Sequence, residues 1–154
     1  MNIINKAKAF LSFDTRTKLL LVEAFFYLGW ARILKSIPFS KAAPILGIHM
    51  DETSLSYDES EKIMLRKISQ AVHMMSRYTF WESQCLVKAI AAMKMLEKRR
   101  IESTLYLGTA KDETGNMIAH AWLRSGPFYI TGAEEMKRFT VVGKFAKKDR
   151  VKKS

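Results

Sequence analysis

Residues 81–89 read Trp81-Glu82-Ser83-Gln84-Cys85-Leu86-Val87-Lys88-Ala89 and contain the only cysteine of the chain. Ser83 is a suitable N-cap, and apolar residues follow at helical spacing: Leu86, Ala89, Ile90, Met93 and Leu96. We therefore expect a helix that holds Cys85 in its first turn. The unpaired N–H groups and the dipole at that end stabilise a thiolate and can hold a developing oxyanion. A small buried core residue is the alternative for a lone cysteine, and the local sequence does not decide between the two.

Three strands are expected after this helix, at residues 101–110, 117–124 and 127–131. A loop at 111–116 and a tight turn at Ser125-Gly126 would join them as antiparallel neighbours. Two helices are expected earlier in the chain, from Arg16 to about Leu34 and from a Ser60 cap to about Tyr78, with a connector at 39–49 between them. The sequence thus predicts an α+β fold in which N-terminal helices precede the Cys85 helix, packed on a small antiparallel sheet.

His120 lies on the second expected strand, within Ala119-His120-Ala121-Trp122, and is the best candidate for a base that meets Cys85. If Ser125 and Gly126 form the turn, direct pairing sets Arg124 opposite Pro127, Trp122 opposite Tyr129, and His120 opposite Thr131. The Thr131 hydroxyl would then be within reach to orient the imidazole. The alternative for His120 is a hydrogen-bonded histidine on a half-buried strand, without a chemical role.

These motifs carry a resemblance to a known family. Cys85 to Ala89, Leu105-Tyr106-Leu107-Gly108-Thr109 and Ala119 to Leu123, supported by 129–132 and 138–142, closely resemble the leader peptidases of lasso-peptide biosynthesis. Those enzymes are transglutaminase-like cysteine proteases with a papain-like core, in which a helix-borne Cys, a strand-borne His and usually an Asp on the following strand form a triad. No Asp follows His120 until Asp149. Thr131 is nearest to that place by pairing, and Glu134 and Glu135 lie just beyond it.

The resemblance implies a cysteine endopeptidase that removes the leader from a ribosomally made lasso-peptide precursor. Cys85 would be the nucleophile, His120 the base and Thr131 the orienter. It also implies a separate leader-recognition protein as partner, and a lasso cyclase downstream that would use the ATP, so that no cofactor is expected in this chain. Two alternatives stay open: a transglutaminase-like acyl transferase, and a non-catalytic basic module that binds an acidic peptide or a membrane surface.

Composition sets further bounds. A chain of 154 residues with 48% hydrophobic residues is expected to form one domain, which we place at 1–143, followed by a basic tail at 144–154. A single cysteine excludes an intramolecular disulfide and a cysteine-based zinc site, and it fits a reducing cytoplasm. His49, His73 and His120 lack metal-ligand spacing, so no metal site is expected. The first dozen residues are not a secretory signal.

The expected helix at 16–34 is apolar nearly all round but is interrupted by Glu23 and Arg32 and is too short for a membrane span. We expect it to be buried, with a partner protein as the second reading and a membrane surface as the third. It is our candidate docking surface for the leader-recognition protein. The net charge of +11 is concentrated at 94–100 and 144–153, and aromatic residues are not interleaved there as they are in a platform that binds single strands. A nucleic-acid partner is therefore not expected, and no glycine-rich phosphate loop indicates a nucleotide site.

Overall fold

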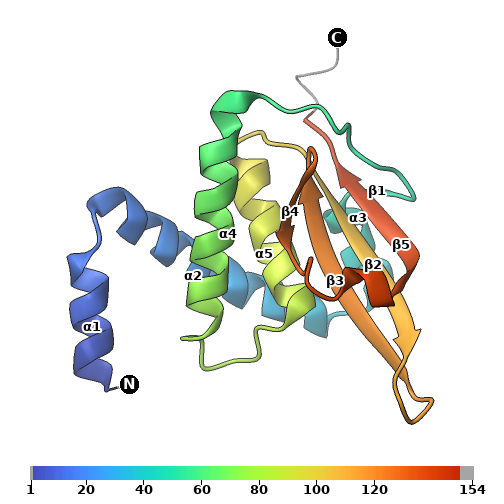
Figure 1. Ribbon diagram of the computed structural model, residues 1–154, viewed down its shortest axis with the longest axis horizontal. Coiled ribbons are helices and arrows are strands. Elements are labelled where there is room, and N and C mark those ends of the chain that lie inside the picture. Colours follow the sequence, from blue (N-terminus) through green and yellow to red (C-terminus); the bar gives the residue numbers. More distant parts are fainter. Residues whose placement is uncertain (1, 150–154) are drawn as a thin grey trace.

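Residues 2–149 are described by the computed structural model of the chain (Figure 1). The helices are α1 (Ile3–Ser12), α2 (Thr15–Ser36), α3 (Phe39–Leu46), α4 (Lys62–Ser76) and α5 (Cys85–Lys98), with short 3-10 turns η1 (Glu59–Glu61) and η2 (Met136–Arg138). The strands are β1 (Ile48–His49), β2 (Ser103–Lys111), β3 (Met117–Ser125), β4 (Phe128–Thr131) and β5 (Thr140–Lys147).

The five strands form one antiparallel sheet in the order β1-β5-β2-β3-β4. Helix α5 packs on β2, β3 and β4, and α2 packs on α4 and α5. Figure 1 shows α2, α4 and α5 gathered on one side of the sheet. The predicted α+β class, with N-terminal helices and a cysteine helix on an antiparallel sheet, is therefore confirmed.

The core lies between α5 and the sheet. Alternate strand residues, among them Leu105, Leu123 and Phe145, are fully buried in one cluster with the apolar residues of α5. Truncating a fully buried leucine such as Leu96 would cost about 2–5 kcal/mol. The intervening residues of β2 and β3 form a separate stack of rings that includes Tyr106 and Trp122, whose centroids are 5.6 Å apart. The sheet thus has one face in the core and a second face built from aromatic rings.

The expected helices at 16–34 and 60–78 correspond to α2 and α4, but two other expectations are wrong. The segment expected as a connector at 39–49 contains α3, which tolerates Pro44 inside it, and the edge strand β1. Residues 144–147, assigned to the basic tail, form the second half of β5 and pair with β2. Lys147 belongs to the fold, since its ammonium group donates to the Ile45 carbonyl at the end of α3, 2.8 Å away. Tail residues 150–154 lie outside the described residues.

Candidate active site

Cys85 is the first residue of α5, so the prediction that it lies in the first helical turn is confirmed. The N-cap is Gln84 rather than Ser83, whose hydroxyl is instead 2.8 Å from that of Thr79. The Gln84 side chain makes no cap hydrogen bond, and its carbonyl accepts the first intrahelical bond, from the Lys88 N–H. The first-turn N–H groups near the thiol thus receive no side-chain cap and are oriented to stabilise negative charge.

The loop before Cys85 is fixed to α2. Trp81 packs against Phe25, with ring centroids 5.0 Å apart, and would lie 3.4 Å from a Cβ added at Gly29. Glu82 accepts a hydrogen bond of 2.8 Å from Lys35, and this bond lowers the pKa of the Glu82 carboxyl. These contacts hold the chain that leads into the thiol at a defined place beside α2.

His120 is half-buried on β3, and its Nε2 lies 2.8 Å from the carbonyl oxygen of Gly132. A carbonyl only accepts, so the hydrogen bond places the ring proton on Nε2 and leaves Nδ1 of the neutral ring able to take a proton. Gly132 has a φ of +77°, and a Cβ there would lie 2.5 Å from the Ala121 oxygen. Only glycine brings its carbonyl to the imidazole without strain at this position.

The predicted pairing of β3 with β4 is wrong. Gly126 and Pro127 form the turn, so Ser125 pairs with Phe128 and Arg124 with Tyr129. A bulge then sets Leu123 opposite Thr131, and His120 lies beyond the paired region. The Thr131 side chain is 2% exposed, and its hydroxyl has no hydrogen-bond partner within residues 2–149.

The reason for choosing Thr131 as the residue that orients the His120 ring therefore no longer holds. The Gly132 carbonyl occupies that role in the geometry, while Glu134 and Glu135 are exposed to solvent. Sequence reasoning missed Gly132 because it searched for an acidic or hydroxyl side chain. The available signal was a glycine directly after a short strand, which is typical of a left-handed backbone residue.

Two aromatic rings enclose the imidazole. Trp122 and Phe139 stack on His120 with centroids 5.8 Å and 5.0 Å away and interplanar angles of 26° and 30°. Gly108 lies opposite His120 on β2, and a Cβ there would come within 2.8 Å of Phe139 and 2.9 Å of Trp122. The glycine of the 105–109 motif is thus required because the two rings fill the space of a side chain.

Behind Trp122, the ring stack is anchored by a buried arginine. Arg124 donates to the Tyr106 hydroxyl at 2.9 Å, and it also donates to the carbonyls of Thr53 and Gly126 at 2.9 and 2.7 Å. Burial is the main cause of the raised pKa of Tyr106, whose hydroxyl donates to Glu52. These bonds tie the segment around Thr53 to the sheet and fix the rings that support the imidazole.

The structure brings His120 together with Gly132, and α5 packs on β3. Ala121 and Leu123 of β3 face α5 in the core, however, so His120 lies with Trp122 on the other face of the sheet. Within residues 2–149, no hydrogen bond joins the Cys85 thiol to the His120 ring. The pairing of the two groups is therefore a proposal and is not part of this geometry. The arrangement can supply a thiol at a helix start and an imidazole of fixed tautomer.

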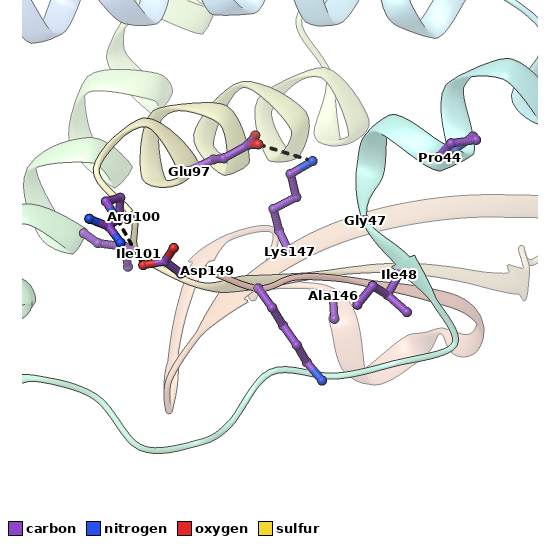
Figure 2. Close-up of a pocket in the computed structure, with 10 residues that line it drawn as sticks. Pro44, Gly47, Ile48, Glu97, Arg100, Ile101, Ala146, Lys147 and Asp149 are labelled. Carbon is purple, nitrogen blue, oxygen red and sulfur yellow. Dashed lines mark hydrogen bonds and ion pairs between the residues drawn. The ribbon is translucent and has the colours of Figure 1, made fainter. Parts of the chain in front are cut away.

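A cavity lies at the other end of α5. It has a volume of about 650 Å³ and lies between the end of α5, the end of α3 and β5 (Figure 2). Four of its charged side chains form two ion pairs: Lys147 with Glu97 at 3.4 Å, and Arg100 with Asp149 at 3.2 Å. Glu97 and Cys85 are separated by about 18 Å along α5 at 1.5 Å per residue. The candidate site at the start of α5 is therefore separate from this cavity.

Among the described residues, no group of three or more His, Cys, Asp and Glu side chains is placed to hold a metal ion. None of the helices in residues 2–149 is long and apolar enough to cross a membrane.

Comparison with known proteins identifies a family. Residues 31–144 match the family model described as the transglutaminase-like superfamily, a match that includes Cys85, His120 and Gly132. No curated protein and no solved structure matches the chain.

Proposed function

Because the family model covers well over half of it, the chain belongs to the transglutaminase-like superfamily, and on that premise we propose that it is a cysteine endopeptidase acting on a lasso-peptide precursor. The superfamily includes cysteine proteases and acyl transferases. The observation that carries the proposal is the tautomer of His120, which the Gly132 carbonyl fixes so that Nδ1 is available as a base.

The proposed reaction uses both groups in sequence. Nδ1 of His120 takes the thiol proton, and the Cys85 thiolate attacks the carbonyl carbon of the scissile bond. The N–H groups at the start of α5 stabilise the developing oxyanion. The imidazolium then protonates the leaving amine, which departs with the C-terminal product. The same imidazole then takes a proton from water, which attacks the thioester and releases the N-terminal product as a carboxylic acid. The imidazolium returns its proton to Cys85 and regenerates the thiol.

The proposed substrate is a lasso-peptide precursor, cut between leader and core. It rests on the likeness of residues 85–89, 105–109 and 119–123 to lasso leader peptidases. We propose that a separate leader-recognition protein presents this precursor, in the reducing cytoplasm where the thiol stays free, and that a lasso cyclase acts next.

The solvent side of α2 is the proposed docking surface for the leader-recognition protein. Leu19, Val22, Phe26 and Ile33 are exposed there, at spacings of three, four and seven residues that place them on one helix face. The opposite face of α2, which includes Leu21, Ala24 and Leu28, is buried in the core. An exposed apolar face of this extent is typical of a protein interaction surface.

A transglutaminase-like acyl transferase is the second candidate, because the superfamily match covers both activities. It would use the same thioester but resolve it with an amine instead of water. The product distinguishes the two candidates, since hydrolysis releases two peptides and transfer leaves an adduct.

The testing experiment is mass spectrometry of a candidate precursor incubated with the protein, with and without the leader-recognition protein. We expect cleavage at one bond, faster with the partner and abolished in Cys85→Ala. The double variant Phe26→Ser/Ile33→Ser should lose the acceleration by the partner, whereas Ile63→Ser, which changes an equally exposed residue on α4, should keep it. Intact precursor in every reaction, or cleavage that survives Cys85→Ala, would overturn the proposal.

A further inference from the structure

The outer edge of β3 is open beside His120. Strand β4 pairs with β3 only at Leu123, Arg124 and Ser125. Residues 117–122 of β3 pair with β2 on their inner side, and no strand in residues 2–149 pairs with their outer side. Gly132 lies against Ala121 and Trp122, so the backbone N–H and C=O groups that remain available to another chain are those of residues 117–120.

Gly132 is the reason that strand pairing stops. Its φ of +77° redirects the chain directly after Thr131, where β4 ends, and its backbone lies against Ala121 and Trp122 of β3. The Gly132 carbonyl then bonds to the His120 side chain instead of to the backbone of β3. The same residue that orients the imidazole thus ends the covering strand.

The exposed edge lacks the usual protection. Natural edge strands are kept apart from other chains by charge, proline or very short length. At the opposite edge of the sheet, β1 is only two residues long. In β3, by contrast, Met117, Ile118 and Ala119 carry no charge and no proline, and Met117 is 72% exposed. This segment is suited to strand pairing and requires a specific occupant.

We infer that an extended segment of the peptide substrate pairs with residues 117–120 of β3 as an added strand. The inference rests on the proposed function and deepens it. A strand added here runs directly past His120, so its backbone is delivered to the base. The open segment, at about 3.3 Å per residue, holds roughly four residues of an extended peptide. A second copy of this chain is disfavoured as the occupant, because each copy carries a net charge of +11.

Recognition of this kind relies on main-chain hydrogen bonds. Ala119 contributes only a methyl group at the edge, so its backbone is accessible. Because the hydrogen-bonding groups of a strand alternate in direction, every second residue of the bound peptide would bond to β3. Peptide binding should therefore depend on the backbone N–H of every second substrate residue and depend little on the side chains at those positions.

The test is a scan of backbone N-methylation in short synthetic peptides centred on the cleaved bond, with KM and kcat measured for each. N-methylation at alternate residues should raise KM about tenfold, and at the intervening residues it should have little effect. As a second measurement, Ala119→Pro, which removes an edge N–H, should raise KM, with the rate of Cys85 alkylation as the check on an intact site.

Two failures are distinguishable in this experiment. If the unmodified peptide is not cleaved, the proposed function fails. If it is cleaved but the N-methyl scan shows no alternation, strand addition is wrong while the peptidase activity stands. A flat scan together with a concentration-dependent dimer that Ala119→Pro abolishes would assign the edge to a second copy and also overturn the inference.

Discussion

Replacing Gly132 by alanine tests the role of its carbonyl. The added Cβ would lie 2.5 Å from the Ala121 oxygen and 2.8 Å from the Trp122 Cβ, contacts that require the backbone to move. The φ of +77° also places an alanine in the left-handed region, which costs about 1 kcal/mol. Overpacking against fixed backbone costs about 1–3 kcal/mol more, so we expect Gly132→Ala to lower the free energy of unfolding by about 2–4 kcal/mol.

Gly115→Ala is the matched control. Gly115 has a φ of +84° in the loop between β2 and β3, and a Cβ there would meet no atom within 4 Å. Only the conformational cost of about 1 kcal/mol should remain, which corresponds to a decrease in Tm of about 2–4 °C for a chain of this size. The difference between the two variants in urea denaturation isolates the steric cost at Gly132.

The catalytic rate of Gly132→Ala is the sharper test of the role of the Gly132 carbonyl. A hydrogen bond to a charged group contributes about 1.5–3 kcal/mol, so displacing the Gly132 carbonyl should lower kcat about 10- to 100-fold. Gly115→Ala should keep the wild-type rate. Thr131→Val should also keep it, because the Thr131 hydroxyl has no partner among the described residues. Full activity of Gly132→Ala, or a large loss in Thr131→Val, would refute the assignment of the carbonyl as orienter.

Three further predictions follow from the supporting contacts. Phe139→Leu removes one ring from the imidazole and should lower kcat about fivefold with KM unchanged, and Phe139→Tyr should restore the rate. Glu23→Gln removes the carboxylate charge and one of the two 2.7 Å bonds from Arg99, and it should lower the free energy of unfolding, measured in urea, by about 2 kcal/mol. The lowered pKa of Glu82 means that the contribution of this carboxylate is complete above its ordinary pKa of 4.5 and is lost as the pH falls through the lowered value. The protection of residues 79–84 against hydrogen exchange, taken relative to the intrinsic rate at each pH, should therefore fall at low pH in wild type and be low at every pH in Glu82→Gln.

The spacing of apolar residues within single helices and strands was sufficient to predict much of this fold. The apolar spacing after Ser83 predicted α5 with Cys85 in its first turn, and the alternating segments predicted β2, β3 and β4 within a few residues. In both cases the signal lies within one element, where a helix or strand period determines which side chains are buried.

Relations between elements were harder to predict. Ser125-Gly126 and Gly126-Pro127 are both acceptable turn sequences, and choosing between them shifts every pair of the hairpin. The bulge that sets Leu123 opposite Thr131 moves the register further, and it has no local sequence signal. The α3 helix was missed because Pro44 and Gly47 favour a loop, whereas Lys147, about a hundred residues later, satisfies a carbonyl at its end.

The same distinction explains the missing third member of the triad. A side-chain carboxylate can be sought by residue type, but a backbone carbonyl is present at every residue, and only the φ of Gly132 and the end of β4 bring this one to His120. A carbonyl fixes the imidazole tautomer but carries only a partial charge, so it stabilises an imidazolium less than a carboxylate would. More of the stabilisation of a thiolate–imidazolium pair must then come from the uncapped N–H groups at the start of α5, which act on the thiolate. A backbone carbonyl in place of an acid beside His120, as the described residues have it, is therefore compatible with the proposed Cys85 chemistry and makes that chemistry more dependent on the start of α5.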